Sequence, residues 1–320
     1  MDLRGAQRRI DAHAPSPEMT TRAEHQQFCQ ESRQLYLEGR NARSDGDDWR
    51  EALWIARRKM IALFRASDFL LDIPKALRTS AGHTTALRHL LAPPISQDQF
   101  KLLCPQWSKE LENKCRPMTA NNAEAVGLVF NQRRSRRLTS WLTYNRPARL
   151  DEVVTAIDAT TPLIASQVVA TARRSRLSRE QEDAAIGVLE ERNWVKVMSS
   201  TVSTGGQLPA RNYMHKTRFA SGPNENQEVD IACGLGGTVV LAMECKVTND
   251  TTNSVKRIND VLKKAGAWRG HWGTFVRPAA LLQGVISFTD VERLLDYPVE
   301  VFWAHKIDLF AEWIEANTSA

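Results

Sequence analysis

The chain has 320 residues, 42% of them hydrophobic, which is enough for one large domain or two ordinary domains with packed cores. Its net charge of +6 is unevenly placed, because residues 1–150 carry 25 Lys and Arg against 16 Asp and Glu, whereas residues 151–320 carry 18 against 21. The five cysteines form no CxxC pair, no apolar signal segment follows Met1, and no apolar run approaches the roughly 20 residues of a membrane span. These features argue against zinc-binding, disulfide-stabilised and membrane proteins, and they favour a soluble cytoplasmic protein with a polyanionic partner.

The N-terminal half is predicted to be mainly helical. Residues 1–20 are polar, contain Pro15 and Pro17, and are expected to form a flexible tail. Apolar residues at helical spacing then predict a helical region over residues 21–175. We expect its first helices over residues 21–40, 47–71, 76–91, 97–115 and 123–144, the second of them closed by Pro74.

A basic run lies in the last of these helices and contains Arg133, Arg134, Arg136 and Arg137. Such a run is either a solvated helix face or a stripe that contacts phosphates. Because this whole half is basic, we interpret residues 21–175 as a region that binds DNA or forms a dimer.

The segment 150–174 allows two interpretations. A short helix over 151–158 is followed by Thr161 as a helix N-cap, Pro162 at the first helical position, and a second helix over 163–174. This order is compatible with a DNA-reading helix-turn-helix. Ordinary helical packing produces the same pattern more often and is the favoured interpretation.

From Ser178 onward strands alternate with helices, which predicts an α/β fold. A helix capped by Ser178 is expected to run to Arg192, with Glu182 at the end of its apolar face. The strands are predicted over residues 194–198, 212–219, 227–233, 238–247, 281–288 and 299–304. Further helices are predicted over residues 253–268, 289–295 and 306–316.

The most informative stretch is the hairpin that carries Asp230 and then Glu244-Cys245-Lys246, with three glycines at its turn. Because side chains alternate along a strand, Glu244 and Lys246 point to one face and Cys245 to the other. The hairpin brings Asp230 back beside them. Glu244 and Lys246 could form an exposed ion pair of little energetic value. They follow the apolar run VVLAM, however, where an acid needs a cation, and this favours a divalent-metal site for phosphodiester hydrolysis.

This order of elements resembles the PD-(D/E)xK nuclease core over residues 178–304. Asp230 matches the first acid, Glu244 the second and Lys246 the lysine, although Val229 stands where the family pattern has proline. The stretch ECKVTNDTTNSVKRIND and the tryptophan-rich segment after it are similar to the XamI-type restriction endonucleases, which join this core to a helical N-terminal part. The resemblance implies a mixed central sheet flanked by helices (α/β, or α+β) in a nuclease domain over residues 176–320.

The resemblance also implies roles for the residues. Asp230 and Glu244 would hold Mg²⁺ together with the backbone carbonyl of Cys245, and Lys246 would orient the attacking water. Glu182 would support the site, and Glu228, on the same strand face as Asp230, is a substitute ligand. DNA contacts are expected from the start of the following helix, at Asn253, Ser254, Lys256 and Arg257. The remaining candidates for bases are interpreted as exposed or packing histidines: His215, His271 and His305.

A restriction enzyme of this type would act in the cytoplasm of a prokaryote and cut double-stranded DNA at a short palindromic site. A two-fold homodimer suits such a site, a GTCGAC-like sequence is the first to test, and a cognate methyltransferase would act on the same sequence. Two alternatives remain open. One is a repair or recombination nuclease that recognises DNA structure, and the other is an inactive DNA-binding protein, against which the intact set of Asp230, Glu244 and Lys246 argues.

Overall fold

The computed structural model describes residues 20–40 and 42–319, so the tail expected over residues 1–20 lies almost wholly outside the described residues. The chain divides into two compact units. Residues 42–173 form a mostly helical unit, called here the helical unit. The described residues 20–40 and 174–319 form the second, called here the sheet unit because it holds the β-sheet.

The helical unit begins with helix α3 (Ala42–Ala66), whose buried residues lie at helical spacing. The helix was expected to continue to Leu71, and that boundary is wrong. Asp68, Phe69 and Leu70 have left-handed backbones with φ of 48°, 54° and 72°, which turn the chain before Pro74 is reached. The indole of Trp141 donates a hydrogen bond of 2.8 Å to the carbonyl of Phe69 and so fixes this turn to the core.

Short helices complete the helical unit where longer ones were expected. They are α4 (Ile73–Thr79), η1 (Ala81–His83), α5 (Thr84–His89), α6 (Gln97–Leu103), α7 (Lys109–Asn113), α8 (Ala120–Arg133) and α9 (Ser140–Thr143). They surround one apolar cluster that includes Trp107 and Trp141, both fully buried. The salt bridge between Arg88 and Glu112 is buried beside this cluster, with a separation of 2.8 Å.

Helix α10 (Leu150–Glu191) is a single helix of 42 residues that contributes to both units. The predicted break between helices over 151–158 and 163–174 is therefore wrong, and with it the helix-turn-helix alternative. Thr161 is not an N-cap but is buried within the helix, and Pro162 lies inside the helix. A proline at such a position removes one backbone hydrogen bond and costs about 3 kcal/mol. Ile157 and Ile164, on either side of it, are buried in the core of the helical unit, and this burial opposes the cost.

Among the described residues, α10 is also a helix long and apolar enough to cross a membrane by length and composition, although the sequence predicted no such run. Core helices of soluble proteins pass the same test, and 39% of the apolar stretch is buried inside the structure. Ala156, Ile164 and Ala165 belong to the core of the helical unit. The stretch is therefore weak support for a membrane span.

The sheet unit is built on one mixed sheet of seven strands, in the order β1-β3-β4-β5-β6-β7 with β2 also paired to β3. The antiparallel hairpin expected around the glycines joins β4 to β5, and β5, β6 and β7 are parallel. The strands are β1 (Val195–Lys196), β2 (Thr201–Val202), β3 (Asn212–Gly222), β4 (Glu225–Gly236), β5 (Val239–Thr248), β6 (Val276–Gly284) and β7 (Glu300–Trp303). Strand β6 starts five residues before the predicted position, and Phe288, predicted as its last residue, instead opens a helix capped by Ser287.

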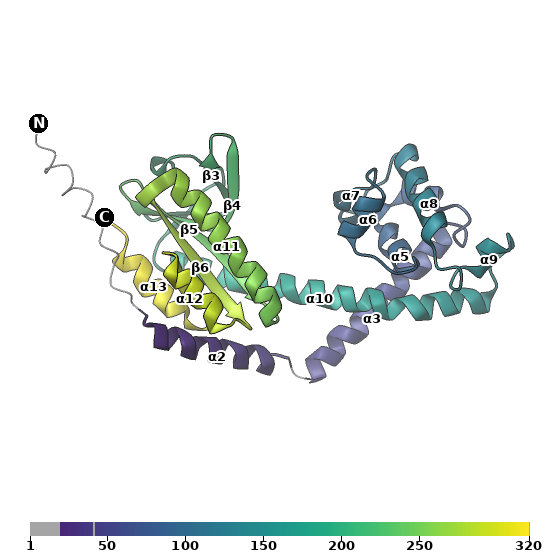
Figure 1. Ribbon diagram of the computed structural model, residues 1–320, viewed down its shortest axis with the longest axis horizontal. Coiled ribbons are helices and arrows are strands. Elements are labelled where there is room, and N and C mark those ends of the chain that lie inside the picture. The colour runs from purple at the N-terminus through teal and green to yellow at the C-terminus, as the bar shows by residue number, and fades with distance from the viewer. Residues whose placement is uncertain (1–19, 41, 320) are drawn as a thin grey trace, which may run out of the picture. The chain divides into compact units, whose positions relative to one another are not determined.

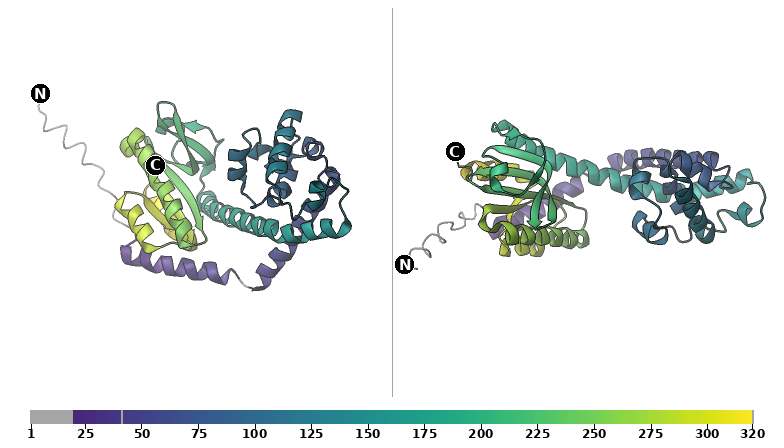
Figure 2. Two further views of the ribbon diagram at one scale, coloured as in Figure 1. Left: turned by 45° about the vertical axis from the view of Figure 1, so that its right-hand side comes forward. Right: turned by 90° about the horizontal axis from the view of Figure 1, so that it is seen from above.

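Helices cover both faces of the sheet, as Figure 1 and the two views of Figure 2 show. The last turns of α10 and helix α13 (Ile307–Ala316) pack on one face, around Met243 and Leu281. Helices α11 (Thr251–Trp272) and α12 (Phe288–Asp296) pack on the other, around Ala242 and Leu282. The short helices η2 (Gly205–Gln207), η3 (Gly273–Phe275) and η4 (Ala304–Lys306) lie in the connections. The predicted mixed sheet flanked by helices is confirmed.

Helix α2 (Arg22–Glu38) packs with the sheet unit, although the sequence grouped its residues with the helical region. Thr21 caps it in a reciprocal capping box with Glu24. The hydroxyl of Ser32 donates to the carbonyl of Gly284 at 3.0 Å and accepts from the amide of the same glycine at 2.9 Å. These bonds join α2 to the end of β6, next to the strand that carries the candidate site.

Candidate active site

Strand β5 carries two charged side chains in its buried second half. Its apolar residues pair with β4, and the last such pair is Met243 of β5 with Ile231 of β4. In this register the next residues, Glu244 of β5 and Asp230 of β4, lie across from each other. Gly236 and Gly237, with φ of 104° and 58°, make the tight turn that this pairing requires. The predicted alternation also holds, since Cys245 packs in the apolar cluster beneath α10 and α13.

Glu244 is fully buried and is held by two lysines. Its Oε2 accepts hydrogen bonds from Lys246 Nζ at 2.6 Å and from Lys264 Nζ at 2.8 Å. Lys246 also lies 3.2 Å from Asp260, so two acids hold its ammonium. Burial raises the pKa of Glu244 in spite of the lysines. Burial also acts to lower the pKa of Lys246, but Glu244, Asp230 and Asp260 together raise it. Glu244 Oε1 is buried without a hydrogen-bond partner.

Asp230 belongs to a second group of charges at the same end of the hairpin. Its Oδ2 accepts a hydrogen bond of 2.8 Å from the backbone N–H of Cys245, and its Oδ1 lies 2.7 Å from Lys216 Nζ. The same ammonium lies 2.6 Å from Oε1 of Glu182, whose Oε2 lies 2.8 Å from Nε2 of His215. Although burial works in the opposite direction, Lys216 and the Cys245 amide lower the pKa of Asp230.

Lys216 has an unusual backbone for a lysine in a strand. Its φ is 55°, in the left-handed region, which costs about 1–3 kcal/mol for a residue other than glycine. Its neighbours are paired normally, His215 with Ile231 and Thr217 with Val229, so Lys216 lies across from Asp230 in the register. Strain of this kind persists only where surrounding contacts stabilise it, and it is concentrated at functional sites.

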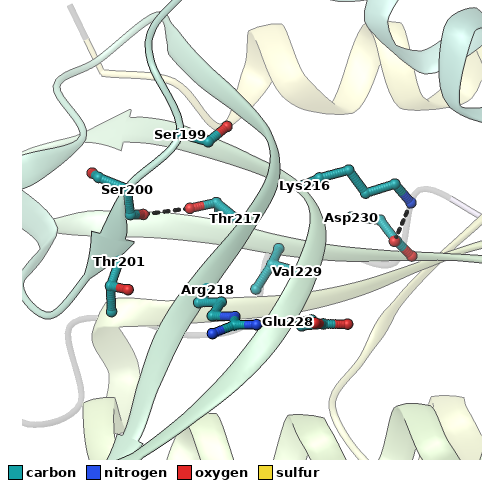
Figure 3. A pocket seen from close by; sticks show the side chains of 9 residues that line it. All are labelled: Ser199, Ser200, Thr201, Lys216, Thr217, Arg218, Glu228, Val229 and Asp230. Atoms are coloured by element: carbon teal, nitrogen blue, oxygen red, sulfur yellow. Dashed lines mark hydrogen bonds and ion pairs between the residues drawn. The ribbon is translucent and has the colours of Figure 1, made fainter. Parts of the chain in front are cut away.

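A pocket of about 380 Å³ opens beside Asp230 (Figure 3). Most of its lining side chains carry a hydroxyl or a positive charge: Ser199, Ser200, Thr201, Thr217, Lys216 and Arg218. The acids Glu228 and Asp230, with Val229 between them, complete the wall. Glu228 is exposed and lies 3.4 Å from Arg218. It therefore lines the pocket but makes no described contact with Asp230 or Glu244.

Two of the residues expected to contact DNA from the start of α11 are already engaged within the protein. Ser254 is fully buried and its hydroxyl donates to Asp290 at 2.7 Å, so its prediction as a DNA contact is not supported by this structure. The Asn253 side chain is exposed but donates to Asp250 at 2.6 Å. Lys256 is exposed and lines an open pocket of about 560 Å³ with Thr251, Thr252, Val255, Asn259 and Ser287. Arg257 is half-buried.

The basic run of the helical unit is placed where α8 ends. Arg133, Arg136 and Arg137 are exposed. Arg133 and Arg136 line an open hollow of about 520 Å³. Arg134 differs, because its guanidinium donates to the carbonyl and hydroxyl of Thr139 and to the hydroxyl of Thr143. Its first role is to close the turn between α8 and α9.

Sequence reasoning missed four side chains of the site. His215, interpreted as a packing or exposed histidine, lies against Glu182, whereas His271 is exposed and His305 packs against Phe28 and Trp303. Lys216, Lys264 and Asp260 were not considered. Lys264 and Asp260 are four residues apart on α11, and Lys264 follows buried Val261 by three residues. A lysine beside the apolar stripe was the available signal.

The described residues contain no group of three or more His, Cys, Asp or Glu side chains arranged to hold a metal ion. The carboxylates of Glu182, Asp230 and Glu244 are each bound instead to a lysine ammonium. The chemistry of the donors still suits Mg²⁺, which binds oxygen ligands and uses few carboxylates. The unpartnered, buried Oε1 of Glu244 is an acceptor that such an ion would satisfy.

Comparison with known proteins identifies the family. A model described as "XamI restriction endonuclease" matches residues 68–303, a range that includes every site residue from Glu182 to Lys264. The chain belongs to the XamI restriction endonuclease family. The resemblance inferred from the sequence is thereby confirmed, and XamI-family membership places the chain among the restriction endonucleases.

One curated relative and one solved structure accompany this match. Type II restriction enzyme XamI from Xanthomonas campestris pv. amaranthicola is 28% identical over 240 residues, which are 71% of this chain and 83% of that enzyme. The crystal structure of protein VC1899 from Vibrio cholerae matches with a TM-score of 0.31 and 9% identity over 85% of this chain, which spans 58% of that protein. A TM-score of this size supports no conclusion, so XamI-family membership rests on the sequence comparisons.

Proposed function

We propose that this protein is a type II restriction endonuclease that uses Mg²⁺ to hydrolyse both strands of DNA at a short palindromic site. The observation that carries the proposal is the cluster of Asp230, Glu244 and Lys246 at one end of a buried hairpin, within a chain of the XamI family. A charged set in this position destabilises the fold unless it is paired, so its presence in a central strand favours a catalytic role.

The ligands for Mg²⁺ would be Asp230, Glu244 and the backbone carbonyl of Cys245, with Glu182 in support. In a strand the N–H and the C=O of one residue point to the same side. Because the Cys245 amide donates to Asp230, its carbonyl is expected to face the same side as that carboxylate. When bound, Mg²⁺ supplies a more acidic water and offsets negative charge on the phosphate.

Lys246 is the residue proposed to act directly on the reacting groups. Its ammonium is positioned by Glu244 at 2.6 Å and by Asp260 at 3.2 Å, and only 9% of its side chain is exposed. The raised pKa keeps it protonated, so it can donate hydrogen bonds to the attacking water and to a phosphate oxygen. Lys264, on the same carboxylate, would hold Glu244 ionised in its buried position.

Contacts with DNA are proposed for four exposed residues. Lys256 at the start of α11 and the arginines Arg133, Arg136 and Arg137 carry charges suited to phosphates. A homodimer would cut both strands of a palindrome with two copies of this site, and a cognate methyltransferase would protect the same sequence. Family membership agrees with action in the cytoplasm of a prokaryotic cell.

Digestion of plasmid and phage DNA tests the proposal. Purified protein is incubated with and without Mg²⁺, beside Lys246→Ala, on DNA that contains a GTCGAC site and on a matched DNA that lacks it. Discrete metal-dependent fragments are expected from the wild type alone. Smearing, or cleavage only at branches and ends, would show recognition of DNA structure, and retained DNA without metal-dependent cleavage would rule out the proposed activity.

A further inference from the structure

Lys216 makes a contact that the proposed chemistry does not use. Its ammonium lies 2.6 Å from Glu182 Oε1 and 2.7 Å from Asp230 Oδ1, and so bridges an acid from α10 with an acid from β4. Burial by itself would disfavour the charged form, but the hydrogen bonds to Asp230 and Glu182 raise the pKa of Lys216. The bridge is therefore a cation held between two acids that are candidates for metal binding.

The Lys216 side chain can leave this position without disturbing the core. It is 53% exposed, whereas the side chains of Glu182 and Asp230 are 8% and 20% exposed. The other two lysines of the site, Lys246 and Lys264, are only 9% and 15% exposed. Lys216 is thus the exchangeable cation among the three, and the pocket of about 380 Å³ that it lines has room for its side chain.

The backbone supports the same interpretation. Lys216 keeps a left-handed φ of 55° in the middle of an otherwise paired strand. Figure 3 shows its side chain reaching toward Asp230 from the edge of the pocket. A lysine in this conformation is retained against an unfavourable backbone by the two carboxylates that bind its ammonium.

We propose that Lys216 is an internal counter-ion that competes with the divalent cation for Asp230 and Glu182, and that the cation must displace it before the site can act. This inference rests on the metal binding of the proposed function and not on DNA cleavage. It adds a residue that sets the metal affinity of the free protein, and it makes Glu182 a participant in cation binding. A neutral side chain at this position removes the competitor while all the carboxylates remain.

Isothermal titration of the DNA-free protein with Mg²⁺ alone tests the competition. Lys216→Met keeps the length of the side chain and removes its charge, and it is expected to tighten binding by about tenfold or more. Lys216→Arg keeps a cation and should bind Mg²⁺ as the wild type does. Arg218→Ala is the matched control, because it removes one positive charge from the same pocket without a described contact to Asp230 or Glu182. Asp230→Asn should abolish binding in every background.

A second measurement uses the unmodified protein. Labelling with an amine-reactive reagent, read by mass spectrometry, should increase at Lys216 when Mg²⁺ is added and stay constant at the exposed Lys196. Unchanged or weaker Mg²⁺ binding in Lys216→Met, equal tightening in Arg218→Ala, or Lys216 labelling that does not rise would each overturn the proposal. DNA cleavage is scored separately, so a protein that shows the exchange but cuts no DNA would refute the proposed function and leave this inference standing.

Discussion

Substitution of Lys264 by methionine should reveal how the buried charge of Glu244 is maintained. The change removes the Lys264 ammonium, which is one of two cations on the buried Glu244 carboxylate and lies 2.8 Å from its Oε2. It also removes the hydrogen bond of 3.0 Å that this ammonium donates to the carbonyl of Glu228. Hydrogen bonds to charged groups contribute about 1.5–3 kcal/mol, so the free energy of unfolding should fall by about that amount at pH 8. Lys263→Met, at an exposed position on the same helix, should change it by less than about 0.5 kcal/mol.

The pH dependence distinguishes this explanation from a simple loss of packing. Lys264 stabilises only the ionised form of Glu244, whose pKa burial has already raised, so its removal raises that pKa further. As the pH falls, the variant protonates Glu244 and no longer contains an under-compensated buried charge, so the difference in stability from the wild type should shrink. If cleavage requires ionised Glu244, the acidic limb of the pH–rate profile should move about one to two pH units upward, since 1.36 kcal/mol corresponds to one unit.

Urea denaturation of both variants at pH 8 and pH 5.5, with single-turnover cleavage across the same range, measures these effects. A loss of stability that is equal at the two pH values, with an acidic limb that does not move, would refute the reasoning. It would mean that the alkyl chain of Lys264, rather than its charge, stabilises the site.

Three further predictions concern the site lysine Lys246, the basic run of the helical unit and the core of the sheet unit. Lys246→Ala should reduce the cleavage rate by about 10²–10³ while a gel-shift assay shows retained DNA binding, since the residue acts on the reacting groups; equal loss of binding would contradict this. Arg136→Ala should weaken DNA binding and reduce the slope of log K against log salt by about 1, whereas Arg134→Ala should chiefly lower the melting temperature because Arg134 binds Thr139; identical effects of the two would be the contrary result. Trp268→Ala, at a fully buried position, should reduce the free energy of unfolding by about 3–5 kcal/mol in denaturant titrations, and a change below about 1 kcal/mol would show that its cluster contributes little.

The hairpin could be predicted because its information is local. Alternation along β5 and glycines at the turn were enough to bring Asp230, Glu244 and Lys246 together, and the register of β4 and β5 agrees with that prediction. The layers of helix and sheet were likewise visible in the change of hydrophobic period from one segment to the next.

The other site residues depend on tertiary packing. Lys216 reaches Asp230 and Glu182 through a left-handed backbone in β3, which no propensity would assign to a lysine. Lys264 meets Glu244 because α11 packs across β5, and this depends on contacts of Trp268 and Ala242 that are distant in sequence. Pro162 was interpreted as a helix start because local rules favour that position, whereas burial on both sides of it lets α10 continue.

The position of β5 in the sheet has a consequence for how this family can diversify. The strand that holds Glu244 and Lys246 is paired on both sides, by β4 and by β6, and its alternate side chains are buried in the core. The exposed residues Thr251, Thr252 and Lys256 belong to the helix that follows, α11. They make no described contact with Asp230 or Glu244. If the start of α11 contacts DNA and β5 carries the cleavage chemistry as proposed, substitutions at these exposed positions would alter DNA contacts while the buried strand stays constant.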